Sequence, residues 1–197
     1  MEESEKTWVL QAIAGDPVAF SKLVEAYQKP VYNLAYRLLG NSVEAEDAAQ
    51  ETFIRAYTRL ETYDPSRKFS SWMLSIASHY CIDMLRRRRA NVLSMDELPP
   101  MVDLSMPRAT QPEHVVIEEQ AADEVQQLLS TLPPSYRTPV ILRYWYDMSY
   151  REIAETMGVT ESTIKTRLHR ARAKLAESAQ NQRHNLAQDQ VYEQATV

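Results

Sequence analysis

Glycine and cysteine are scarce in this chain, and each scarcity excludes a class of protein. Its 197 residues include three glycines and one cysteine. Three scattered glycines cannot form a glycine-rich phosphate-binding loop, which disfavours an α/β nucleotide-binding fold. The lone Cys81 cannot form an intramolecular disulfide, which fits a reducing cytoplasm.

Long apolar runs are also missing. The longest is much too short to span a bilayer, and the chain opens without the apolar segment of a signal peptide. We therefore expect a cytoplasmic protein that does not insert into a membrane.

The sequence shows no strand-like alternation of apolar and polar residues. Apolar residues recur instead at three- and four-residue intervals, the spacing of helices with one buried face. Asp16-Pro17 marks one helix start and Asn41 with Glu44 marks another. Pro30 is expected to break or kink the first of these helices. The expected core faces are Phe20, Leu23, Val24 and Tyr27 in the first helix, and Ala48, Ala49, Phe53, Ile54 and Tyr57 in the second. The pattern predicts an all-α protein.

Proline and periodicity divide the chain into two small helical domains joined by a flexible linker. The first domain is expected over residues 1–89 and ends in a long helix that begins near Ser70. Residues 90–120 are an acidic linker with four prolines and no sustained periodicity. The second domain is expected over residues 121–177. The polar tail, residues 178–197, is expected to be disordered.

The net charge of −5 hides two basic segments. Residues 63–89 hold six basic and two acidic residues, and residues 161–175 hold five basic and one acidic. Between them, residues 90–124 hold one basic and eight acidic residues. This distribution predicts contact with a polyanion at two separate places, with the acidic segment kept away from it.

The second basic segment follows the pattern of a helix-turn-helix. Ser149 and Glu152 form a capping box at the start of one helix, Gly158 can end that helix, and Thr160 can cap the next. The second helix carries one narrow apolar stripe of Ile164, Leu168, Ala171 and Leu175 on an otherwise basic surface. A solvated amphipathic helix packed on a small bundle would show the same stripe. The capped helix and glycine turn before it favour a helix that enters a DNA major groove.

Two sets of residues together resemble one family, the extracytoplasmic-function (ECF) sigma factors. Their second conserved region resembles Asp47 to Tyr57, Phe69 to Ala77 and Asp83 to Arg87 of this chain. Their fourth region resembles Leu132-Pro133, Arg143-Tyr144 and Ser149 to Leu175. The resemblance implies a protein that binds core RNA polymerase and directs it to promoters. It implies that the first domain docks on the β′ clamp helices and reads the −10 element, and that the second docks near the β flap and reads the −35 element. An anti-sigma factor is a common partner in the family.

The resemblance also assigns candidate residues. The implied polymerase contacts are Asp47, Gln50, Glu51 and Arg55, and the implied −10 contacts are Tyr63, Lys68, His79, Arg86, Arg87 and Arg88. In the helix-turn-helix, the candidate base readers are Lys165, Thr166, His169 and Arg170, and the candidate phosphate contacts are Arg151, Ser162, Thr163, Arg167 and Arg172. His79 stands where the family often has asparagine, and Trp72 is expected in the core. The alternative interpretation is that these polar helix faces and basic helix ends are solvated surfaces without a binding partner.

Two other functions fit parts of the sequence. A stand-alone helix-turn-helix regulator would bind palindromic duplex DNA as a dimer without polymerase. An enzyme could use Asp47 and Glu51 as a carboxylate pair, but no metal-ligand set, nucleophile triad or phosphate loop accompanies them. His79 and Cys81 point apart on a helix and do not form a metal pair. We therefore expect no catalytic residue, metal, cofactor or small-molecule substrate.

Overall fold

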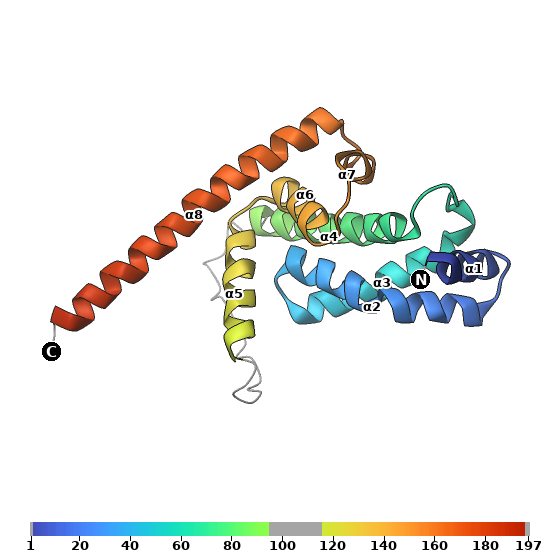
Figure 1. The fold of residues 1–197 in the computed structure, drawn as a ribbon, viewed down its shortest axis with the longest axis horizontal. Helices are drawn as coiled ribbons and strands as arrows, with labels where there is room; N and C mark the ends of the chain where they lie inside the picture. Colours follow the sequence, from blue (N-terminus) through green and yellow to red (C-terminus); the bar gives the residue numbers. More distant parts are fainter. Residues whose placement is uncertain (1, 95–115, 196–197) are drawn as a thin grey trace.

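The computed structural model describes residues 2–94 and 116–195, and the regular elements in these two segments are all helices (Figure 1). In chain order they are α1 (Glu2–Ile13), α2 (Pro17–Leu39), α3 (Ser42–Thr58), the 3-10 turn η1 (Leu60–Thr62), α4 (Phe69–Ser94), α5 (Val116–Ser130), α6 (Pro134–Tyr144), α7 (Tyr150–Met157) and α8 (Glu161–Ala195). The all-α prediction is confirmed. The middle of the expected linker lies outside the described residues.

Helices α1 to α4 form the first helical group around a continuous apolar core. Asp16 caps α2 by accepting a hydrogen bond from the Val18 amide at 2.8 Å. Gly40, with a φ of 74°, ends the same helix in the left-handed conformation. The helix runs through Pro30 without a break, because burial of Val31 and its neighbours compensates for one lost backbone hydrogen bond.

Helix α3 packs on α2 through small residues. Ala45, Ala48 and Ala56 are completely buried. The expectation that Ile54 and Tyr57 are core residues is wrong, because 59% of Ile54 and 55% of Tyr57 is exposed. Ile54 lies on the opposite side of the helix from the buried alanine face, so it cannot reach α2. Small residues bring the two helices close and leave Ile54 facing solvent, while the partly exposed Tyr57 packs edge-on against Phe20 of α2.

Helices α5 to α8 form the second group. Its fully buried side chains include Leu132, Ile141, Leu142, Ile153, Ile164 and Leu168. Helix α8 projects from this group as one long rod to Ala195 (Figure 1). The described part of the tail is therefore helical where we expected disorder. No glycine or proline interrupts the chain between Thr160 and Ala195, and alanine, glutamine and glutamate propagate a helix once it has started.

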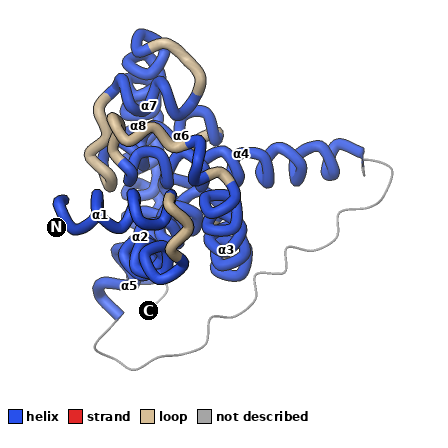
Figure 2. The backbone as a smooth tube through the Cα atoms, turned by 90° about the vertical axis from the view of Figure 1, so that its right-hand side faces the viewer, coloured by secondary structure: helices blue, strands red, loops and turns tan. Residues whose placement is uncertain are grey.

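The two groups pack against each other. Helix α7 lies against α4, and α6 lies against α2 and α4. Figure 2 shows the same close arrangement from the side, with α6, α7 and the start of α8 above α2. Within the two described segments, no helix has both the length and the apolar character needed to cross a lipid bilayer.

Candidate nucleic-acid and polymerase interfaces

The helix-turn-helix is built as its sequence predicts. The Ser149 amide donates to Glu152 Oε2 at 2.8 Å, and the Glu152 amide donates to Ser149 Oγ at 3.2 Å, which completes the capping box. Gly158 has a φ of 62° and ends α7. Thr160 Oγ1 then accepts a hydrogen bond from the Thr163 amide at 3.2 Å and caps α8. These local bonds fix the angle at which α8 leaves the turn.

The N-terminal part of α8 presents a cationic face to solvent. Ile164, Leu168 and Ala171 are buried, so the helix can turn only one face outward. The exposed residues on that face include all four candidate base readers, Lys165, Thr166, His169 and Arg170, together with Ser162 and Arg172. Thr163 and Arg167 are half-buried. Arg151 is exposed at the start of α7 but is paired with Glu155, with Nε and Oε1 3.1 Å apart.

The loop between η1 and α4 is held by aromatic packing. Only 8% of Tyr63 is exposed, and its ring lies 5.3 Å from the rings of both Phe69 and Trp72. Its hydroxyl donates to the Arg67 carbonyl, and burial, helped by the charges of Glu5 and Asp64, raises its pKa. Tyr63 therefore supports the loop from inside and is not exposed for a DNA contact in this state.

Along α4, the candidate −10 residues point outward. His79, Arg86 and Arg87 are exposed. Arg86 lies 3.7 Å from Asp83 on its own helix. Arg88 differs, because it forms an ion pair with Glu44 of α3. The arginines at residues 86–88 thus expose positive charges to solvent, and Arg88 also links α4 to α3.

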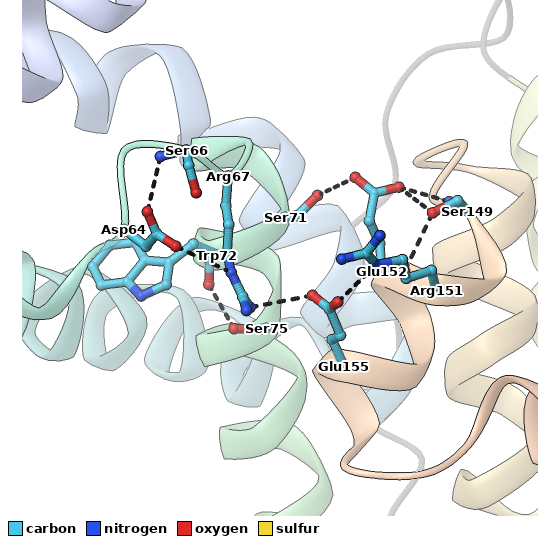
Figure 3. A network of polar contacts seen from close by, with 10 residues as sticks. All are labelled: Asp64, Ser66, Arg67, Ser71, Trp72, Ser75, Ser149, Arg151, Glu152 and Glu155. Carbon is cyan, nitrogen blue, oxygen red and sulfur yellow. Dashed lines mark hydrogen bonds and ion pairs between the residues drawn. The ribbon is translucent and has the colours of Figure 1, made fainter.

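Figure 3 shows a polar network that joins this loop to the helix-turn-helix. Ser71 Oγ donates to Glu152 Oε1 at 2.9 Å, Lys68 Nζ lies 3.6 Å from the same oxygen, and an Arg67 guanidinium nitrogen lies 3.2 Å from Glu155 Oε2. Partial burial raises the pKa of Glu152, but hydrogen bonds from Ser149 and Ser71 and the charge of Lys68 outweigh it and leave that pKa below its ordinary value.

The sequence did not predict this network between the loop and α7. Arg67, Ser71, Glu152 and Glu155 carry no motif for pairing, and Ser71 and Glu152 are 81 residues apart. Each has an ordinary local role, since Glu152 already completes the capping box. Only the packing of the two helical groups brings them together.

A separate surface lies on α3. Asp47 and Gln50 are exposed, and Glu51 and Arg55 form an ion pair at 2.7 Å. The Arg55 guanidinium also lies 4.6 Å from the centre of the Tyr80 ring. Exposed Val43, Ile54 and Tyr57 share this side of the helix. The α3 face, as we call Val43, Asp47, Gln50, Ile54 and Tyr57, is therefore both acidic and apolar. Within the described residues, no group of three or more histidine, cysteine, aspartate or glutamate side chains could hold a metal ion.

A helical chain with an exposed helix-turn-helix in one half and a basic helix in the other defines a two-part DNA-binding protein. Comparison with known proteins identifies the family within this class. The chain matches the family Sigma-70 region 2 over residues 23–91 and the family Sigma-70, region 4 over residues 122–175. It is 37% identical over 180 residues to the ECF RNA polymerase sigma factor SigW of Bacillus subtilis, covering 89% of this chain and 96% of that protein.

Other relatives agree. The chain is 36% identical over 177 residues to the ECF RNA polymerase sigma factor SigE of Mycolicibacterium smegmatis, covering 88% of this chain and 67% of that protein. Its fold is similar to that of CnrH, solved with the cytosolic domain of CnrY, with a TM-score of 0.66 and 24% identity over 90% of this chain and 98% of that one. The chain belongs to the ECF sigma factors of the sigma-70 family. It is a non-enzymatic factor that directs transcription initiation, and sigma factors bind RNA polymerase and promoter DNA.

Proposed function

We propose that this sigma factor reads two promoter elements with two separate cationic surfaces while core polymerase holds both. The first half (residues 1–89) reads and helps to open the −10 element, and the second (121–177) reads the −35 element, in the cytoplasm. The observation that carries the proposal is that exposed cations lie on two helical groups that belong to two different sigma-70 regions. Neither surface alone can contact both promoter elements.

The −35 element is read by α8. Lys165, Thr166, His169 and Arg170 lie on the exposed face of a helix whose position is fixed by a capped α7 and a glycine turn. Arginine and lysine pair with guanine edges in a major groove, and threonine reaches either base type. Ser162, Thr163, Arg167, Arg172 and Arg151 surround this face and bind the phosphates.

The −10 element is read by the loop of residues 63–69 and by α4. A base leaves the DNA stack only if contacts in the protein compensate for the unstacking. Lys68, His79, Arg86 and Arg87 supply exposed contacts beside the loop. Tyr63 holds the loop in shape from beneath, and Arg88 contributes after it releases Glu44.

Polymerase docks on the α3 face. Interfaces combine exposed apolar side chains with a polar surround, and Ile54 and Tyr57 are large, exposed and adjacent to Asp47 and Gln50. This face binds the β′ clamp helices, with Glu51 and Arg55 at its edge, and the second half docks near the β flap. RpoE of Bartonella quintana was solved with the anti-sigma factor NepR, and its fold is similar, with a TM-score of 0.63. We propose that an anti-sigma factor also controls this chain.

Transcription in vitro tests the proposal. Bacterial core polymerase, the purified chain and a library of genomic fragments should give core-dependent transcripts from a small set of fragments. Asp47→Ala with Ile54→Ala should weaken binding to core without changing the fold. The matched control is Glu25→Ala with Val18→Ala, which removes one exposed acid and one exposed apolar residue from α2. Transcription that does not require the chain would overturn the proposal.

The DNA contact is tested on the promoters so selected. Arg170→Ala should cost about 1–3 kcal/mol and relax base preference within the −35 element. Lys174→Ala removes the same charge one turn further along α8, where the ammonium lies 5.9 Å from the centre of the Tyr136 ring. The control should retain base preference.

A further inference from the structure

We propose that the free protein is latched: α7 holds the −10 loop through Glu152 and Glu155 and leaves the −35 face of α8 open. The inference rests on the proposed function, because it takes the −10 and −35 surfaces as assigned above. It adds a regulated state that belongs to the chain itself and needs no second protein.

The latch is ionic and lies at one end of the contact between the two groups. All three donors, Arg67, Lys68 and Ser71, come from the −10 loop and the first turn of α4, and both acceptors come from α7. Figure 3 shows Arg67 and Ser71 with the two acceptors. The side chains of Arg67 and Lys68 are 60% and 72% exposed. Exposed ion pairs of this kind are weak and are screened by salt. The latch can therefore open without unfolding either group.

Contacts that involve no carboxylate set the alignment of the two groups. An Arg137 guanidinium nitrogen donates to the Leu38 carbonyl at 2.7 Å, at the C-terminal end of α2, where the helix dipole favours a cation. The Tyr146 hydroxyl donates to the Pro30 carbonyl at 2.6 Å. The Arg37 guanidinium lies 5.0 Å from the centre of the Trp145 ring. These contacts hold α6 and the segment after it on α2, which places α7 opposite the −10 loop.

The closed arrangement covers the two DNA-reading surfaces unequally. A cleft of about 500 Å³ separates the loop and α4 from α7, and it is lined by Lys68, Trp72, His79, Arg151 and Glu155. A second cleft of about 590 Å³ lies between Arg86 of α4 and Arg167 of α8. Lys68, His79 and Arg86 therefore line clefts that α7 and α8 bound on one side, although the side chains of His79 and Arg86 stay exposed. The base-reading face of α8 remains exposed.

Promoter geometry requires the latch to open. Elements centred near −10 and −35 are about 25 base pairs apart, which is about 85 Å at 3.4 Å per base pair. In the latched state, Arg86 of the −10 surface and Arg167 of the −35 surface line the same cleft, so one molecule cannot reach both elements. Glu152 and Glu155 neutralise cations that would otherwise meet phosphate groups, and DNA and polymerase must displace these two carboxylates.

A distance measurement tests the latch without DNA or polymerase. Spin labels on Ala26→Cys in α2 and Ala173→Cys in α8 occupy exposed positions, and native Cys81 is completely buried and stays unlabelled. The full chain at low salt should give one short distance. Glu152→Gln with Glu155→Gln should add a long-distance population, and high salt should do the same. Glutamine at 152 can still complete the capping box, and Glu25→Gln with Glu177→Gln, at two exposed positions, is the charge-matched control.

A charge swap separates the ion pair from general destabilisation. Arg67→Glu should open the chain, and Arg67→Glu with Glu155→Arg should close it again. An identical short distance in the wild type and the Glu152→Gln, Glu155→Gln variant at every salt concentration would overturn the latch. So would a wild type that is already open at low salt.

Binding to core polymerase gives a second readout. If the competent fraction limits binding, the apparent Kd of the Glu152→Gln, Glu155→Gln variant should fall by about threefold to tenfold at low salt. An unchanged Kd with a changed distance would overturn the inhibitory role of the latch. A wild type that never binds core would overturn the proposed function and leave the distance result standing.

Discussion

Cys81 illustrates how burial decides the chemistry of one side chain. It lies in α4 among the core residues of the first group and is completely buried. Desolvation raises the pKa of its thiol to about 12. The reactive form of a cysteine is the thiolate, so this thiol is inert while the protein is folded.

Alkylation tests this expectation at the level of one residue. Iodoacetamide at about pH 8, near the ordinary thiol pKa, should leave Cys81 unmodified in the native protein and modify it in urea, as read by mass spectrometry. The transition should follow the unfolding curve measured by circular dichroism. Rapid modification without denaturant would show that the core around α4 opens readily.

Sequence reasoning succeeded for residues whose role is local. It expected Trp72 in the core, and the structure packs it, half-buried, against Tyr63 and Phe69 at the edge of that core. It did not foresee that Tyr63 is buried, because a loop aromatic between a threonine and an aspartate carries no sign of which neighbour covers it. His79 and Arg86 point to solvent, so their contacts with DNA stay predictions.

At the scale of the element, the turn between α7 and α8 depends on one backbone conformation. Gly158 has a φ of 62°, and a Cβ added there would meet nothing within 4 Å. Gly158→Ala should therefore destabilise the protein through backbone strain alone, by about 1 kcal/mol. Gly158→Asn should lose less, because asparagine tolerates the left-handed conformation. Urea unfolding measures both variants, and equal losses would contradict this explanation.

The start of α7 predicts a pH dependence. The pKa of Glu152 in the folded protein lies below its ordinary value of 4.5, for the reasons given above. A carboxyl group with a lowered pKa stabilises the fold above its unfolded-state pKa, and this contribution disappears as the pH falls through the folded-state value. The groups that contact its carboxylate are Lys68, Ser71 and Ser149, while Arg67 and Arg151 pair with the neighbouring Glu155.

The free energy of unfolding of wild type and Glu152→Gln should therefore differ by about 1 kcal/mol at neutral pH. The difference should shrink as the pH falls through and below 4.5, the ordinary value. Glu177→Gln, on α8 and away from the capping box, should show no such trend. A difference that stays constant over this range would mean that the charge of Glu152 does not stabilise the folded state.

Element starts could be read from the sequence because caps are local signals. Asp16, Ser149 and Thr160 each bond to a backbone amide within three residues, as expected. The ends of the helices and the faces that they bury were harder to predict from the sequence. Helix α8 continues past the point where apolar periodicity stops, and α3 turns Ile54 outward, because its alanines make the closer contact with α2.

At the scale of the whole molecule, the two sigma regions and their order followed from the sequence, but their packing did not. Arg137 bonds to the Leu38 carbonyl across 99 residues, and Tyr146 bonds to the Pro30 carbonyl across 116. Every residue has a backbone carbonyl, so the sequence does not indicate which carbonyl a distant side chain will bond to. The closed state is a property of the folded chain alone.

The central claim is that two surfaces on one chain read two elements at a fixed separation. The most direct measurement is run-off transcription with core polymerase on a selected promoter into which about half a helical turn, roughly 5 base pairs, is inserted between the elements. The insertion moves one element to the opposite side of the duplex. Transcription should be lost after this insertion and should also fall with Arg170→Ala. Initiation that tolerates both changes would contradict the account.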